Sequence, residues 1–150
     1  MLNTDRALKL FAWVPALYAA HIMLWYEQFK LNGAEGSVML FQTIADWIGI
    51  GGYEPAFRLT VAWAEIVASV LLINTGSRMF GALLTMGIMS GAIFFHVASP
   101  LGIDPYNDGG ALFKEAVMTW LSAAIILAVY RVELRALVAG QLARPMRLAI

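Results

Sequence analysis

The sequence predicts an all-α integral membrane protein: a four-transmembrane-helix bundle with an extra short interfacial or re-entrant helix between helices 1 and 2. The composition is the first reason, since 61% of the 150 residues are hydrophobic, 13% are charged and the mean hydropathy is +0.72. A soluble domain of this length carries more charge. The second reason is that four apolar runs are each long enough to cross a hydrocarbon core about 30 Å thick.

The four runs define the spans of a single membrane domain that comprises residues 1–150. They are expected at residues 8–29, 57–76, 79–99 and 111–130. Glycine and proline mark loops at residues 49–55 and 99–110. Because the turn at residues 75–78 is very short, the second and third spans should form an antiparallel hairpin. The apolar segment 37–50 is too short for a span, so we expect an amphipathic helix there.

Lysine and arginine predict which side of the membrane each loop occupies. One side collects Arg6, Lys9, Arg78, Arg131, Arg135, Arg144 and Arg147, whereas the other holds Lys30, Arg58 and Lys114. The first side should therefore be cytoplasmic, with both termini inside and residues 131–150 as a cytoplasmic tail. We expect the chain to be integral to the plasma (inner) membrane of a bacterial-type cell, with membrane lipids as its surroundings.

Several kinds of chemistry find no support in the composition. The absence of cysteine excludes disulfides, thiolate metal sites and iron–sulfur clusters. A net charge of zero gives no reason to expect a nucleic-acid partner. No metal-binding or flavin-binding motif is visible.

Glu65 is the most informative residue of the sequence. It is the only ionisable residue between Arg58 and Arg78, and burying a carboxylate in a membrane costs about 3 kcal/mol or more. Arg58 stands seven residues earlier, which is nearly two helical turns, so the two side chains should share a face. A carboxylate within a span is a functional hypothesis by default.

A rise of about 1.5 Å per residue places ionisable groups of all four spans in the outer half of the bundle. Span one contributes His21, Glu27 and Lys30, span two Arg58 and Glu65, span three His96, and span four Lys114 and Glu115. We expect Glu65 and His96 to be catalytic and the other six residues to bind ligand. Hydrophobic residues should fill the cytoplasmic half.

Each of these residues also has a structural interpretation. The three outer cations could extend to lipid headgroups. Glu65 could form an ion pair with Arg58 or Lys114. Either histidine alone could be a hydrogen-bonded residue of the bundle. The convergence of basic, acidic and imidazole groups at one level of all four spans favours a ligand site.

A resemblance to a known family rests on several short motifs. Ala64-Glu65-Ile66-Val67, Leu71-Leu72, Gly76, Arg78, Gly81-Ala82-Leu83-Leu84 and His96 resemble the second and third helices of DoxX-like membrane proteins. Phe29-Lys30-Leu31 and Asn107 before Lys114-Glu115 look like that family's end of helix one and loop into helix four. The resemblance covers residues 8–131. Glu27 and Ala68-Ser69 stand where the family often has glycine.

The resemblance implies a four-helix membrane bundle with cytoplasmic termini. The functions it implies are diverse: small subunits of quinol oxidase and thiosulfate:quinone oxidoreductase systems, partners of redox enzymes, and accessory or assembly proteins.

The leading functional hypothesis is a quinone-linked redox component, a subunit of a quinone-dependent oxidoreductase. His96, Lys30 and Arg58 would bind the quinone carbonyls, and Glu65 would exchange protons. A redox partner would have to deliver the electrons. The alternative is a non-enzymatic accessory or assembly subunit of a larger membrane complex, docked through segment 37–50 or the tail. A haem b held by His21 and His96 is disfavoured, because their depths differ by about two turns.

Overall fold

The structure is a computed structural model that describes residues 4–142 of the chain. Over this range, all of the regular secondary structure is helical. The helices are α1 (Thr4–Phe11), α2 (Trp13–Leu31), α3 (Glu35–Trp47), the 3-10 turn η1 (Gly51–Tyr53), α4 (Glu54–Ile73), α5 (Arg78–Ala98), α6 (Ala111–Val129) and α7 (Arg131–Leu142). Four helical segments are long and apolar enough to cross a membrane, which confirms the predicted fold class.

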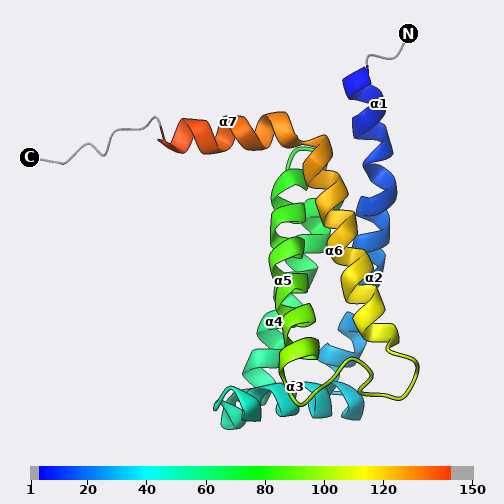
Figure 1. Cartoon of the computed structure of the whole chain (residues 1–150), viewed down its shortest axis with the longest axis vertical. Coiled ribbons are helices and arrows are strands. Elements are labelled where there is room, and N and C mark those ends of the chain that lie inside the picture. The colour runs from blue at the N-terminus through cyan, green and yellow to red at the C-terminus, as the bar shows by residue number, and fades with distance from the viewer. Residues whose placement is uncertain (1–3, 143–150) are drawn as a thin grey trace, which may run out of the picture.

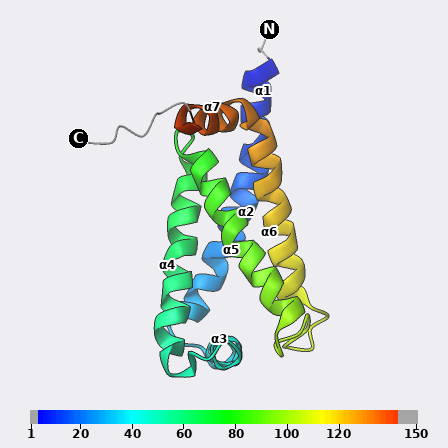
Figure 2. The same cartoon turned by 60° about the vertical axis from the view of Figure 1, so that its left-hand side comes forward.

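The four spans form a bundle whose two ends are each crossed by a shorter helix (Figure 1). Helix α2 packs against α4 and α6, and α5 packs against the same two helices, so α2 and α5 lie diagonally opposite each other. Helix α3 lies across one end, here called the α3 end. Helix α7 lies across the other, the α7 end, where α1 also lies (Figures 1 and 2).

The first span is interrupted, although the sequence predicts one helix over residues 8–29. Pro15 has no N–H to donate to the carbonyl of Phe11, four residues earlier, so α1 ends at Phe11. The interruption is slight, because the N–H of Ala12 bonds to Leu8 O at 3.0 Å. The N–H of Ala16 bonds in turn to Ala12 O at 3.2 Å. Together α1 and α2 therefore form one candidate span, Arg6–Leu31.

Three predicted boundaries differ from the structure by about one turn, among them the end of α4, which is Ile73 instead of residue 76. Helix α4 begins three residues before the predicted span 57–76, because Pro55 stands in its first turn, where a missing N–H breaks no hydrogen bond. Helix α3 ends at Trp47 instead of residue 50, since Gly49 adopts a positive φ of 81°. Helices α5 and α6 agree with their predicted spans to within one residue. Part of the predicted tail, residues 143–150, lies outside the described residues.

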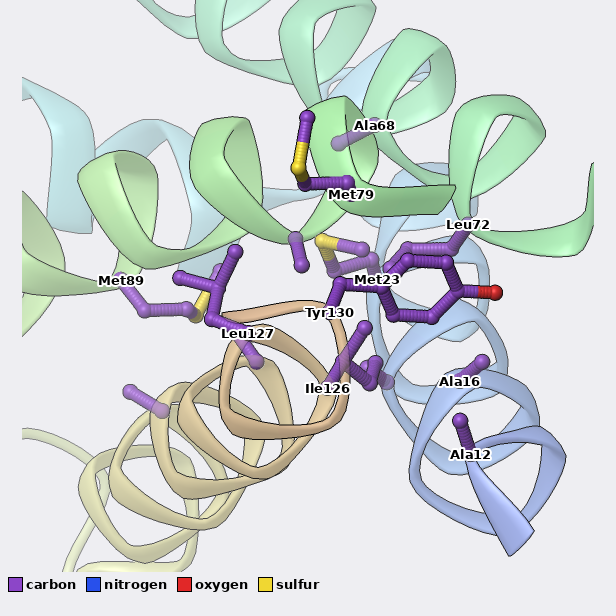
Figure 3. Packing of buried hydrophobic residues seen from close by; sticks show 14 residues of the cluster. Ala12, Ala16, Met23, Ala68, Leu72, Met79, Met89, Ile126, Leu127 and Tyr130 are labelled. Atoms are coloured by element: carbon purple, nitrogen blue, oxygen red, sulfur yellow. The ribbon is translucent and has the colours of Figure 1, made fainter. Parts of the chain in front are cut away.

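Close packing of small side chains holds the α7 half of the bundle together. Ala12, which immediately precedes α2, and Ala16 and Ala19 on α2 are fully buried in the same cluster as Leu72 of α4 and Ile126 of α6 (Figure 3). Without a hydrophobic driving force between helices in lipid, such small residues let backbones approach and gain van der Waals contact. Large apolar side chains such as Val14 and Val97, 66% and 68% exposed, lie on the outside of the bundle, as a lipid environment requires.

The α7 half also holds a buried cation, contrary to the expectation that only hydrophobic residues fill it. Arg78 is 0% exposed. Its Nε donates to Leu72 O at 2.8 Å, and its guanidinium lies 3.9 Å from the ring centroid of Trp13. Arg78 thus satisfies a carbonyl at the end of α4, which has no partner within the helix. The short turn after α4 explains this position, because it leaves the first residue of α5 beside the last turn of α4.

Gly81 should be intolerant of any side chain. A Cβ at this position would lie 2.6 Å from the backbone N of Leu72 and 2.8 Å from the backbone carbon of Leu71. Neither backbone atom can move aside without separating α4 from α5, so we expect Gly81→Ala to lower the free energy of unfolding by about 2 kcal/mol. Denaturant titration in mixed micelles would measure the change.

The matched control is Gly87→Ala on the same helix, because a Cβ there meets no atom within 4 Å. It should leave stability unchanged or slightly raised, since alanine favours the helix. Equal stability of both variants would show that α4 and α5 do not touch at Gly81.

Candidate functional site

A cavity of about 590 Å³ lies near the α3 end of the bundle. Helices α2, α4, α5 and α6 form its sides, and α3 with the loop of residues 99–110 contributes the remaining wall. Most of the wall is apolar, and it includes Phe41, Phe57 and Phe95, whose rings meet edge to face. Phe29 of α2 and Thr60 of α4, which also line the cavity, are exposed and belong to two of the candidate spans. The cavity therefore lies among segments that can cross a membrane.

Four of the eight predicted site residues line this cavity, one from each helix of the bundle. They are Lys30 of α2, Glu65 of α4, His96 of α5 and Glu115 of α6. The structure thus brings together side chains separated by up to 85 residues, from Lys30 to Glu115. Glu27 does not line the cavity but pairs with Lys30, which does, and Arg58, His21 and Lys114 are not part of the wall.

Lys30 is the ion-pair partner of Glu65, whereas the sequence suggested Arg58 or Lys114. Its Nζ lies 2.6 Å from Glu65 Oε2 and 2.9 Å from Glu27 Oε1. All three side chains are largely buried. Lys30 reaches Glu65 because α2 and α4 are neighbours, a fact of helix packing that spacing along one helix cannot reveal. We call these three residues the lysine cluster.

The lysine cluster does not balance its own charge. One ammonium faces two carboxylates, so the cluster holds either one excess negative charge or one proton. Glu27 Oε2 is buried and has no hydrogen-bond partner among the described residues. An unpartnered carboxylate oxygen in a low-dielectric setting is costly, and a proton on it removes the charge. The geometry is therefore suited to binding and releasing a proton.

Arg58 does not line the cavity but bonds to the backbone of Lys30 in the lysine cluster. Its Nε donates to Glu54 Oε1 at 2.7 Å, and its Nη1 donates to the backbone carbonyl of Lys30. That carbonyl belongs to the last turn of α2, where helix carbonyls lack partners. Arg58 therefore positions the backbone of Lys30. Glu54 was not among the predicted site residues, although an acidic residue four positions before a basic one in a helix indicates an ion pair.

His96 is 4% exposed, and one ring nitrogen has a defined role. Its Nδ1 lies 2.7 Å from the carbonyl oxygen of Gly102. Since a carbonyl only accepts, Nδ1 carries the hydrogen, and in the neutral ring Nε2 is left as an acceptor. The ring of Phe113 packs edge to face against the imidazole at a centroid distance of 5.7 Å. Both contacts fix the orientation of a side chain that lines the cavity.

Two tyrosines complete the site, and the sequence gave no local signal for either. The hydroxyl of Tyr26 donates to Glu115 Oε2 across the contact between α2 and α6. The hydroxyl of Tyr106 donates to Gly36 O at 2.9 Å and fastens the loop of residues 99–110 to α3. Burial and the Asp108 carboxylate raise the pKa of Tyr106, so it remains a neutral donor. Their partners are 89 and 70 residues away, beyond any helical period.

His21 and Lys114 lie away from the cavity. His21 stands nine residues before Lys30, which is two and a half turns, so it points from the opposite face of α2. There it is exposed beside Trp25, with ring centroids 6.4 Å apart. The pair of His21 and His96 that a haem would need is not formed. Lys114 is exposed in the first turn of α6, as expected for a cation that extends toward headgroups.

No group of three or more His, Asp or Glu side chains within residues 4–142 is placed to hold a metal ion. Comparison of the chain with models of protein families, with curated proteins and with solved structures finds no match. The residues of this chain and their geometry are therefore the basis from which its function is inferred.

Lys30 should matter more to stability than Glu65. In Lys30→Met the carboxylates of Glu27 and Glu65 lose the one cation that pairs with them within residues 4–142, and breaking such a buried pair costs about 3–5 kcal/mol. In Glu65→Gln the ammonium keeps Glu27 and the amide oxygen can still accept a hydrogen bond, so we expect a loss of about 1 kcal/mol. Denaturant titration in mixed micelles would give both values.

The double variant Lys30→Met/Glu65→Gln tests whether the two residues act together. It should be more stable than Lys30→Met alone, because one unpaired carboxylate has been removed. Strict additivity of the two losses would contradict a direct interaction between Lys30 and Glu65.

Proposed function

We propose that this protein is a quinone-binding component of a membrane redox system, with the cavity at the α3 end as its binding site. The observation that carries the proposal is an apolar, aromatic-walled cavity into which one buried ammonium and one imidazole project from different helices. A volume of about 590 Å³ lies within the range of about 300–1,000 Å³ typical of small-molecule sites.

The walls suit a flat, lipid-soluble ring. Phe41, Phe57 and Phe95 offer ring faces and edges against which another aromatic system can pack. Phe29 and Thr60 of the wall are exposed and belong to candidate spans, so we expect a ligand dissolved in the bilayer to reach the cavity from the side of the bundle. These features favour a hydrophobic ligand over a polar metabolite.

The polar groups suit a ligand that alternates between carbonyl and hydroxyl. The Lys30 ammonium has three hydrogens, of which Glu27 and Glu65 take two, so one is left for a carbonyl oxygen. His96 Nε2 can accept a hydrogen bond from a hydroxyl. The proposal therefore assigns carbonyl binding to Lys30 and not to Arg58, whose guanidinium bonds to Glu54 and to a backbone carbonyl.

Reduction of a quinone to a quinol takes up two electrons and two protons. The excess negative charge of the lysine cluster provides a place for one proton at a time at Glu27 or Glu65, next to Lys30. The two protons would therefore pass through the cluster in turn, with a new proton taken up from water between the two transfers. The electrons come from a reduced partner protein, in keeping with the redox systems that the DoxX-like resemblance implies. Glu65 and His96 then have the catalytic roles expected from the sequence. The hydrogen bond between Tyr26 and Glu115 joins α2 to α6 in the cavity wall.

A second function, as an accessory or assembly subunit, is favoured by one feature. Helix α7 projects sideways from the bundle (Figure 1), and Val132 and Val138 on it are strongly exposed. Such an apolar surface can dock a partner subunit or lie on the membrane. Purification in mild detergent distinguishes the two functions, because an assembly subunit retains a protein partner and binds no quinone.

The sidedness of the bundle should follow the distribution of basic residues. Arg6, Lys9, Arg78, Arg131 and Arg135 all belong to the α7 end, which we assign to the cytoplasm. The cavity then lies in the outer leaflet. A fluorescent protein fused at the C-terminus should fold, and alkaline phosphatase inserted between residues 104 and 109 should be active. The reverse pattern would place the cavity in the inner leaflet.

Quinone binding can be tested by filling the cavity without changing its charges. Gly91 lines the cavity, and a Cβ there meets no atom within 4 Å, so Gly91→Leu should fold yet occupy the ligand's space. We expect binding of a radiolabelled short-chain quinone in lipid nanodiscs to fall at least tenfold. Gly140→Leu, on α7 with an equally open Cβ position, is the control and should bind normally.

Two lysines provide a matched test of the polar contact. Lys30→Gln should weaken quinone binding about tenfold, because a charge-assisted hydrogen bond is lost, whereas Lys114→Gln should bind within twofold of the wild type. Thermal unfolding would confirm that both variants are folded. Wild-type protein that binds no quinone, or equal effects of the two substitutions, would refute the proposed site.

A further inference from the structure

A second hollow, of about 480 Å³, lies at the α7 end, separate from the cavity at the α3 end. Three cations line it: Arg6, Lys9 and Arg78. Trp13 and Tyr130 contribute aromatic rings, and the turn between α4 and α5 forms another part of the wall. Among the described residues, no carboxylate belongs to this wall. The hollow therefore concentrates positive charge where the first span, the α4–α5 turn and the start of α7 meet.

Arg78 distinguishes this hollow from an ordinary basic surface, because it is a buried cation with an unpartnered nitrogen atom. Its side chain is fully buried, and its contacts are backbone carbonyls and the ring of Trp13, none of which carries a negative charge. Nη1 has no hydrogen-bond partner among the described residues. No ion pair in residues 4–142 involves Arg78. A buried cation without a counter-ion is costly, and an anion in the hollow would remove that cost.

The other two cations lie nearer the surface and differ in their surroundings. Lys9 forms an ion pair with Glu133, in which its Nζ lies 2.6 Å from Oε1. The same Nζ lies 5.4 Å from the ring centroid of Tyr130. The hydrogen bond from Lys9 lowers the pKa of Glu133, which therefore stays ionised and holds Lys9 at the rim. Arg6 is exposed and lines the hollow one turn before Lys9. Arg6 and Arg78 thus offer planar guanidinium groups suited to phosphoryl oxygens.

We propose that the hollow at the α7 end is a binding site for an anionic phosphoryl group, supplied by a phospholipid headgroup of the adjacent leaflet. Leu10 favours the lipid over free phosphate, since it lines the hollow and is 56% exposed beside the apolar surface of the first span, where an acyl chain can pack. Trp13 and Tyr130 suit the headgroup level, at which such aromatic residues are enriched. Basic pockets between spans bind anionic headgroups by the same chemistry.

The test compares two arginines at the same end of the protein. Arg6 lines the hollow, whereas Arg135 lies on the exposed surface of α7 and does not. Wild-type protein, Arg6→Gln and Arg135→Gln would be reconstituted in nanodiscs of phosphatidylcholine with increasing phosphatidylglycerol, and native mass spectrometry would count the retained anionic lipid. We expect at least a fivefold loss of retention in Arg6→Gln and less than a twofold loss in Arg135→Gln.

A second arm distinguishes lipid from free anion and does not depend on Arg78 variants, which could fail to fold. Inorganic phosphate is titrated into the protein in neutral detergent, and the thermal unfolding temperature is measured. A rise in the wild type that Arg6→Gln lacks would support the phosphoryl site and assign it to the free anion. Retention of phosphatidylglycerol without a response to phosphate would support the headgroup. Equal losses in both arginine variants, or no preference for phosphatidylglycerol with no response to phosphate, would overturn the proposal.

Discussion

The structure depends on one constraint: a charge buried among membrane-spanning helices must find its partners within the protein, because the bilayer core offers no water. Lys30 meets this constraint at the α3 end by pairing with Glu27 and Glu65, and so joins α2 to α4. Arg78 meets it only in part at the α7 end, through backbone carbonyls of α4 and the ring of Trp13 on α2, because its Nη1 has no hydrogen-bond partner among the described residues. The same two helices are thus held together at both ends by polar contacts.

Between these contacts, the spacing of α4 and α5 changes along the bundle. At Gly81 the helices touch so closely that no Cβ would fit, whereas Gly87 and Gly91, further along α5, have open space at the same position. Figure 2 shows the two helices diverging toward the α3 end. The cavity lies in this wider part, and Leu40, Phe41 and Ile44 of α3 cover it with an apolar face. Close packing at one end therefore creates the opening at the other.

The two ends of the bundle consequently differ in what they can bind. At the α3 end the buried ammonium of Lys30 is exceeded by two carboxylates, which favours the proposed hydrogen bonding and proton exchange with an uncharged, apolar ligand over the binding of an anion. At the α7 end the buried cation has no carboxylate partner among the described residues, so the hollow suits an anion. The difference between the two ends in ligand preference arises from the positions of a few ionisable residues, because the helices that carry them are otherwise mostly apolar.

The sequence by itself determined the number of spans, their lengths to within about one turn, the short α4–α5 hairpin and the extra helix across one end. These features depend on the length of apolar runs and on local glycine and proline, which act along one segment. It also placed Lys30, Glu65, His96 and Glu115 at one level, because depth follows from the rise per residue. A helical count from Lys30 would further have placed His21 on the opposite face.

Only the tertiary structure decided which charges meet. Lys30 rather than Arg58 pairs with Glu65, Tyr26 donates to Glu115, and Arg78 is buried without a carboxylate partner among the described residues. Each outcome depends on how neighbouring helices are rotated about their axes and how far apart they lie. Apolar periodicity leaves that rotation open in a membrane, since both the bundle interior and the lipid favour hydrophobic side chains. Close contacts such as Gly81 against Leu72, formed between different helices, select one arrangement.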